Sequence, residues 1–145
     1  MNDTLRDLYQ AIIVDHARAP RHHGPLPGAT HEASVDNPLC GDQITLRMIV
    51  DAAGRVRAVG FEGQGCAVSQ AAASVLTTRL LGSTLTEARA LIDRFAAFVG
   101  EPPDAPVPGD LGELTAFAGV RAFRSRRACA TLAASAFVRA ISDER

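Results

Sequence analysis

Three cysteines and one aspartate give this 145-residue chain side chains that could hold a soft metal ion. Cys40 and Asp42 lie in one turn-like segment, Cys66 follows a glycine-rich stretch, and Cys129 falls within an arginine- and alanine-rich segment. Three thiolates and one carboxylate suit a tetrahedral zinc ion, because sulfur ligands favour zinc or iron–sulfur chemistry over magnesium or calcium. These four residues therefore form a candidate zinc site.

The spacing of the cysteines leaves a second interpretation open, in which the thiols only pack in the core. The sequence has no C-x-x-C pair, the spacing most typical of a metal site, and free cysteine is among the most buried residue types. Cys129 falls on an apolar helical stripe and fits this interpretation. Cys40 fits it less well, since a turn between Pro38 and Gly41 offers a thiol little to pack against.

A predicted β-hairpin would bring two of the distant cysteines together. Apolar residues alternate with polar ones over residues 43–50, and a turn at 52–54 precedes a second strand over 55–62. The outer ends of an antiparallel hairpin meet, so Cys40 before the first strand would approach Cys66 after the second. Asp42, two residues from Cys40 in an extended segment, would point to the same side.

Helical periodicity and capping signals predict the elements around this hairpin. Helices are expected over residues 3–18, 67–81, 84–99, 111–118 and 125–141. Glycine and proline predict loops at 21–30 and 100–109, and an edge strand is weakly indicated near 33–35. This order predicts a single α+β domain spanning residues 1–145, with helices packed on one face of a small antiparallel sheet of about three strands.

Composition and charge exclude several classes of function. No apolar run approaches the ~20 residues of a membrane-spanning helix, and the polar N-terminus does not resemble a secretory signal. We therefore expect a cytoplasmic protein with no membrane partner. A net charge of −1 argues against a nucleic-acid partner. All 15 basic residues are arginine, which excludes Schiff-base lysine chemistry and a P-loop lysine.

Five motifs resemble the NifU-like family of iron–sulfur assembly proteins, which includes IscU and SufU. They are YQAIIVDH at 9–16, PRHHG at 20–24, NPLCGD at 37–42, GQGCAVS at 63–69 and RRACATL at 126–132.

The resemblance covers nearly the whole chain and implies a SufE/NifU-like fold. It is stronger to the SufU branch, because a long stretch with a proline-rich segment separates Cys66 from Cys129. In addition, Ala128 replaces the histidine that usually precedes the third cysteine of the scaffold branch, and Arg126 is placed as in SufU.

The resemblance to SufU implies a zinc-dependent sulfurtransferase that works as a relay rather than as a stand-alone enzyme. In this hypothesis Cys40, Asp42, Cys66 and Cys129 hold zinc, and Cys40 accepts persulfide sulfur. The donor would be a SufS-type, PLP-dependent cysteine desulfurase, and a downstream iron–sulfur assembly scaffold would receive the sulfur. Two alternatives stay open: a scaffold that assembles and transfers a 2Fe–2S cluster, with iron or the cluster at the same residues, and a structural zinc domain that only binds a partner.

The four histidines carry weaker signals. His16 lies on the apolar stripe of the first helix and is expected to be a core or capping residue. His22, His23 and His31 lie in the loop region, where the sequence does not distinguish a metal ligand from a residue that orders the opening of the site.

An arginine run precedes the third cysteine. Arg121, Arg124, Arg126 and Arg127 either form a solvated helix face or dock an acidic partner. A further alternative is that Arg126 supports and protects the persulfide on Cys40.

Overall fold

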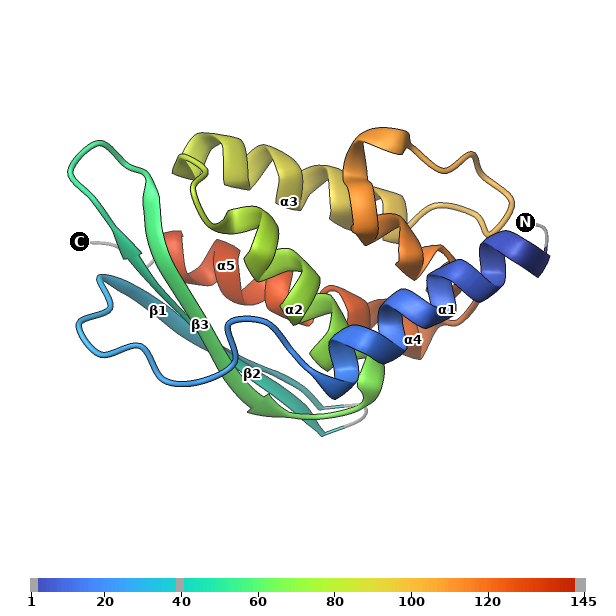
Figure 1. Cartoon of the computed structure of the whole chain (residues 1–145), viewed down its shortest axis with the longest axis horizontal. Helices are drawn as coiled ribbons and strands as arrows, with labels where there is room; N and C mark the ends of the chain where they lie inside the picture. Colours follow the sequence, from blue (N-terminus) through green and yellow to red (C-terminus); the bar gives the residue numbers. More distant parts are fainter. Residues whose placement is uncertain (1–2, 39–40, 143–145) are drawn as a thin grey trace.

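The computed structural model describes residues 3–38 and 41–142. Figure 1 shows the elements along the chain. They are α1 (Asp3–Arg18), β1 (His31–Asn37), β2 (Asp42–Val50), β3 (Val56–Gln64), α2 (Ala67–Leu80), α3 (Leu85–Val99), the 3-10 segment η1 (Gly109–Ala122), α4 (Arg124–Ala130) and α5 (Leu132–Ser142).

The three strands form an antiparallel sheet in the order β1-β2-β3. Its inner face buries Ile44, Leu46 and Met48 of β2, which alternate with residues of the outer face. On the outer face Arg47 pairs with Glu32 of β1 at 3.0 Å and with Glu62 of β3 at 2.6 Å. The alternation of apolar and polar residues therefore leaves one face for the helices, as the sequence predicts.

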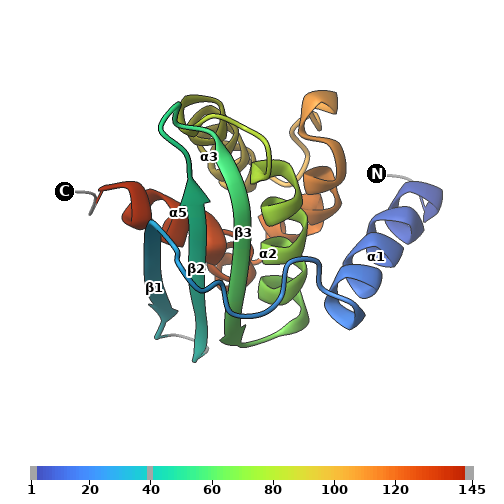
Figure 2. The ribbon, with the colours of Figure 1, turned by 60° about the vertical axis from the view of Figure 1, so that its left-hand side comes forward.

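The helices cover this inner face (Figure 2). Helix α5 packs on β1 and β2, α2 packs on β3, and α1 packs on α2 and η1. On the opposite face the segment after α1 passes over Gly60, where it forms backbone hydrogen bonds with Phe61. The predicted α+β class, a small antiparallel sheet with helices on one face, is confirmed.

Local signals place α3 at the predicted residues. The hydroxyl of Thr84 accepts a hydrogen bond from the Glu87 backbone N–H, and the Glu87 side chain accepts one from the Thr84 N–H. This capping box satisfies two free donors at the helix start. The helices predicted over 3–18 and 67–81 are also observed, within one residue at each end.

The C-terminal helix differs from its prediction. The single helix expected over 125–141 is wrong: α4 ends at Ala130, Thr131 adopts φ −101° and ψ 7°, and α5 starts at Leu132. The Thr131 hydroxyl donates to the carbonyl of Arg127 at 3.0 Å, the kind of local bond that bends helices. Cys129 therefore lies in the last turn of a short helix rather than near the start of a long one.

Two further elements are longer than predicted. The weakly indicated edge strand runs the full length of β1, because its backbone pairs with β2 from His31 to Asn37. The helix expected over 111–118 is the 3-10 segment η1, which is interrupted at Gly112 with φ 58°. A bilayer-spanning helix is absent from the described part of the chain, where every helix is too short or too polar.

Candidate metal centre

Three of the four predicted ligands meet at one end of the sheet. Asp42 begins β2, Cys66 caps the start of α2 directly after β3, and Cys129 comes from the last turn of α4. The carboxylate and the two sulfur atoms all lie within 4.8 Å of one another. Asp42 and Cys129 are 3% and 2% exposed, and Cys66 is half-buried. Distant parts of the chain thus form one partly enclosed donor cluster.

The Asp42 carboxylate is oriented by the start of α2. Its Oδ1 accepts a hydrogen bond from the Cys66 backbone N–H at 3.1 Å, and the Cys66 thiol donates to its Oδ2 at 3.5 Å. Gly65 permits this approach, since a Cβ there would lie 2.6 Å from Asp42 Oδ1 and 2.7 Å from Ser69 Oγ. The glycine before Cys66 is therefore part of the structure of the site.

Asn37 is a site residue that the sequence analysis missed. It is 5% exposed, pairs with Asp42 across the β1–β2 ladder, and its Nδ2 donates to the Cys129 sulfur at 3.9 Å. An N–H that points at sulfur stabilises negative charge on a thiolate. Asn37 belongs to the NPLCGD motif, which could have pointed to it as a site residue. Nothing in the sequence, however, predicts that this motif contacts Cys129.

A depression of about 610 Å³ opens over this cluster. Besides the three donors, its wall includes Ser125 and Arg126 from the first turn of α4. The Arg126 side chain is exposed at this rim. The structure therefore brings together Asp42, Cys66, Cys129 and Arg126 from the predicted set, whereas Cys40 lies outside the described residues.

The described histidines do not belong to the donor cluster. His16 is buried between helices, with Nδ1 2.7 Å from the Ser74 hydroxyl and Nε2 3.3 Å from a Glu113 carboxylate oxygen, as expected of a core residue. His23 packs edge-on against a phenylalanine of β3. His31 is buried at the start of β1, where its Nδ1 contacts the Thr30 hydroxyl at 2.8 Å.

The donor set fits zinc or iron better than a hard cation, because two of the three described donors are sulfur. In a tetrahedral zinc site neighbouring ligand atoms lie about 3.5–3.8 Å apart. The 3.5 Å between Cys66 Sγ and Asp42 Oδ2 matches that spacing. All donor atoms of the cluster lie within 4.8 Å of one another, which exceeds the spacing by about 1 Å. The residues present can therefore hold such an ion with small side-chain adjustments.

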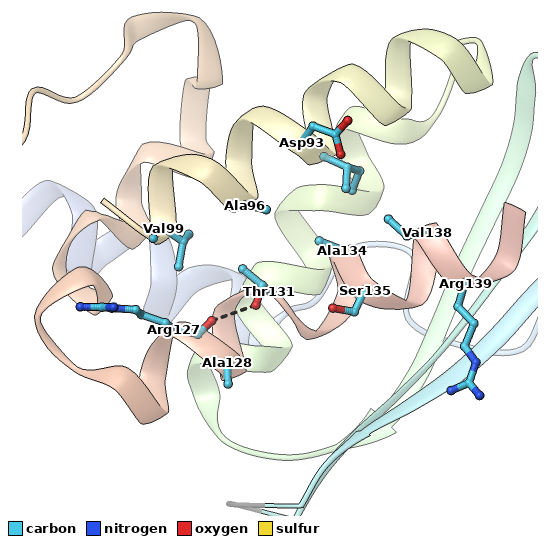
Figure 3. Close-up of a pocket in the computed structure, with 12 residues that line it drawn as sticks. Asp93, Ala96, Val99, Arg127, Ala128, Thr131, Ala134, Ser135, Val138 and Arg139 are labelled. Carbon is cyan, nitrogen blue, oxygen red and sulfur yellow. Dashed lines mark hydrogen bonds between the residues drawn. The ribbon is translucent and has the colours of Figure 1, made fainter. Parts of the chain in front are cut away.

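A second depression, of about 520 Å³, lies between α3 and the α4–α5 pair (Figure 3). Small side chains such as Ala96, Ala128 and Ala134 leave it open, and Arg127 and Arg139 extend away from its centre. Among its described lining residues Asp93 is the one carboxylate, and thiols and imidazoles are absent. This depression therefore lacks the donor cluster that lines the first one.

Comparisons with known proteins show which family the chain belongs to. Residues 8–130 match the family described as the NifU-like N terminal domain. The iron–sulfur cluster assembly scaffold protein IscU of Streptococcus pyogenes is 38% identical over 137 residues, 94% of this chain and 84% of the relative. The zinc-dependent sulfurtransferase SufU of Bacillus subtilis is 35% identical over 144 residues, 99% of this chain and 95% of the relative.

A solved structure shows the same fold. The N-terminal part of a nitrogen-fixing NifU-like protein from Brucella abortus superposes with a TM-score of 0.82 at 28% identity, over 94% of this chain and 93% of that one. Sequence and fold lead to the same assignment. The chain belongs to the NifU-like N-terminal domain family, the iron–sulfur cluster assembly family of IscU and SufU.

Proposed function

We propose that this protein is a zinc-dependent sulfur acceptor, with Cys40, Asp42, Cys66 and Cys129 as zinc ligands and Cys40 as the sulfur-accepting residue. The main support is the donor cluster of two sulfurs and one carboxylate, in which the described residues include no imidazole. Cys40 lies two residues before Asp42 in the sequence and would supply the fourth ligand. The name of the Bacillus subtilis relative, a zinc-dependent sulfurtransferase, also supports this role.

Asp42 has two roles in this proposal. Its Oδ1 is held by the Cys66 N–H, which leaves Oδ2 for the metal. When bound, zinc would supply the positive charge that keeps the ligand thiols deprotonated at neutral pH. A carboxylate is a harder ligand than a thiolate, so Asp42 would make the site more exchangeable than one with four cysteines.

The transfer step is a thiol–persulfide exchange. The Cys40 thiolate attacks the terminal sulfur of a persulfide on a SufS-type, PLP-dependent cysteine desulfurase. A new S–S bond forms on Cys40, the S–S bond of the donor breaks, and its electron pair leaves on the donor cysteine as a thiolate. Arg126, exposed at the rim of the depression, would stabilise the negative charge of the resulting persulfide. The sulfur would then pass to a downstream iron–sulfur assembly scaffold.

Metal content and sulfur transfer test this proposal together. Protein purified without chelator should contain one zinc per chain, and Cys40→Ala should lose sulfur acceptance while keeping its circular dichroism spectrum. Asp42→Ala should lower zinc affinity at least about tenfold in a chelator competition. Asp36→Ala is the matched control, because it removes an exposed carboxylate from the adjacent strand. Full sulfur acceptance by Cys40→Ala would refute the assigned acceptor.

A scaffold role is the second candidate, supported by the name of the Streptococcus pyogenes relative. Here the same residues would hold a 2Fe–2S cluster instead of zinc. Anaerobic reconstitution with iron and sulfide separates the two roles. A stable brown chromophore that transfers to an apo-ferredoxin supports the scaffold, whereas retained zinc and faster desulfurase turnover support the sulfur acceptor.

A further inference from the structure

Positive charge is concentrated in the last third of the chain. Residues 114–142 contain five arginines and no aspartate or glutamate, although the whole protein has a net charge of −1. A local excess of positive charge in a nearly neutral protein favours association with an acidic partner.

The guanidinium groups of three of these arginines donate hydrogen bonds to backbone carbonyls. Arg121 is buried and donates to three carbonyls, Arg127 donates twice to the carbonyl of Arg121, and Arg139 donates to that of Ser34. Arg124 and Arg126 are exposed, and neither forms an ion pair within the described part of the chain. Their guanidinium groups are therefore available to carboxylates of another molecule.

An exposed aromatic ring accompanies these two cations. Phe123 is 61% exposed, more than any other large apolar side chain of the described residues. It lies at the junction of η1 and α4, where its N–H bonds to the Val120 carbonyl and its own carbonyl accepts from the N–H groups of Arg126 and Arg127. These backbone bonds hold the residue in place, so little backbone freedom is lost when a partner covers the ring.

One of the two cations lies at the thiol site, and the exposed ring is close to it along the chain. Arg126 lines the depression over Asp42, Cys66 and Cys129, and Phe123 precedes it by one helical turn. A protein that covers Phe123 would therefore extend over the opening of the site. Aromatic residues and arginine are the types enriched in protein interfaces, where they contribute a large share of the affinity.

We propose that Phe123, Arg124 and Arg126 form the docking surface for the sulfur-donating protein. The partner has an apolar pocket that receives the Phe123 ring and a rim of aspartate or glutamate that pairs with the two arginines. Docking in this way would hold the donor persulfide over the depression. This inference rests on the proposed sulfur-acceptor function, since it assigns the surface that recognises the donor.

Steady-state sulfur transfer tests the docking surface. The zinc-loaded full chain is titrated into a PLP-dependent cysteine desulfurase that is supplied with excess cysteine, and KM for the chain is separated from kcat. Phe123→Ala should raise KM about ten- to thirtyfold, with zinc content and kcat at saturation unchanged. Arg124→Glu should raise KM about tenfold and weaken its dependence on salt concentration.

Two control variants match these changes elsewhere on the surface. Leu8→Ala shortens a side chain that is 55% exposed on α1, and Arg89→Glu reverses a charge on the exposed face of α3. Both should leave KM within about twofold of the wild-type value, because exposed residues outside an interface contribute little to association.

The outcomes distinguish the two proposals. If the wild-type chain accepts sulfur and Phe123→Ala has the same KM, the docking surface is overturned and the sulfur-acceptor function is retained. Absence of transfer with the wild-type chain overturns both. An equal rise in KM for Phe123→Ala and Leu8→Ala also overturns the docking surface. So does an Arg124→Glu variant that keeps the wild-type KM but loses tight binding to a labelled RNA, because its surface would then recognise RNA instead of the sulfur donor.

Discussion

Gly65→Ala directly tests how the Asp42 carboxylate is held. The new Cβ would lie 2.6 Å from Asp42 Oδ1 and 2.7 Å from Ser69 Oγ, and Gly65 has φ +156°, which side chains rarely adopt. Asp42 is 3% exposed, so its carboxylate cannot turn freely towards solvent. We expect the substitution to displace Asp42 and to break its hydrogen bond with the Cys66 N–H.

The expected loss of stability has two sources. Backbone strain at such a position costs about 1–3 kcal/mol. Loss of a buried hydrogen bond to a charged group costs about 1.5–3 kcal/mol. Together they predict that Gly65→Ala lowers the free energy of unfolding by about 2.5–6 kcal/mol. Displacement of Asp42 should also lower zinc affinity about 10- to 100-fold, the range seen when ligand orientation is lost.

Gly28→Ala is the control, because Gly28 has φ +81° but no atom lies within 4 Å of the position that a Cβ would take there. Strain alone should cost about 1–2 kcal/mol at this residue. The free energy of unfolding is measured by urea denaturation with chelator present, so that metal binding does not contribute. Losses that agree within about 0.5 kcal/mol for the two variants would refute the contact between Gly65 and Asp42.

Three further predictions concern the framework around the site. Arg121→Met should lower the free energy of unfolding by about 3 kcal/mol in urea, because Arg121 is 3% exposed and its guanidinium donates to three carbonyls. A loss below about 1 kcal/mol would contradict this. The hydrogen bond from the Thr84 backbone N–H lowers the pKa of Glu87 below its ordinary 4.5. The ionised Glu87 therefore stabilises the fold above pH 4.5, and this stabilisation is lost as the pH falls through the lower pKa of the folded state. NMR titration should show this lowered pKa, and thermal melts should lose more stability on acidification for the wild type than for Glu87→Gln. His16→Leu should cost about 2 kcal/mol by the same urea assay, since the ring links α1 to Ser74 of α2; an unchanged midpoint would contradict it.

Local patterns predicted most of the elements. Period-two alternation indicated the hairpin and its buried face, and the Thr84 capping box located the start of α3. Both features depend on residues close in sequence, so no knowledge of the remaining chain is required. The hairpin in turn predicted that Cys40 would approach Cys66, with Asp42 on the same side, because antiparallel strands bring their outer ends together. The structure places Asp42 beside Cys66, and Cys40 lies outside the described residues.

Elements that depend on packing were predicted poorly. The extent of β1 is set by its pairing with β2, and Ala33 and Val35 are the only apolar residues in it, so its sequence signal is weak. The break at Thr131 was missed because apolar residues continue at helical spacing through it, while α4 packs on η1 and α2 and α5 packs on the sheet. Periodicity indicates which side of a helix is buried, but not where the helix changes direction.

Residue types and local patterns were enough to predict the available donors, the hairpin, most helices, and the approach of the Cys40–Asp42 segment to Cys66. Three relations are visible only in the folded molecule: Cys129 completes the described cluster, Asn37 donates to its sulfur, and Phe123 is exposed one helical turn before Arg126. The physical reason is that these relations join segments far apart in the chain. Their distances depend on how α4 packs against the rest of the molecule, which no local pattern encodes.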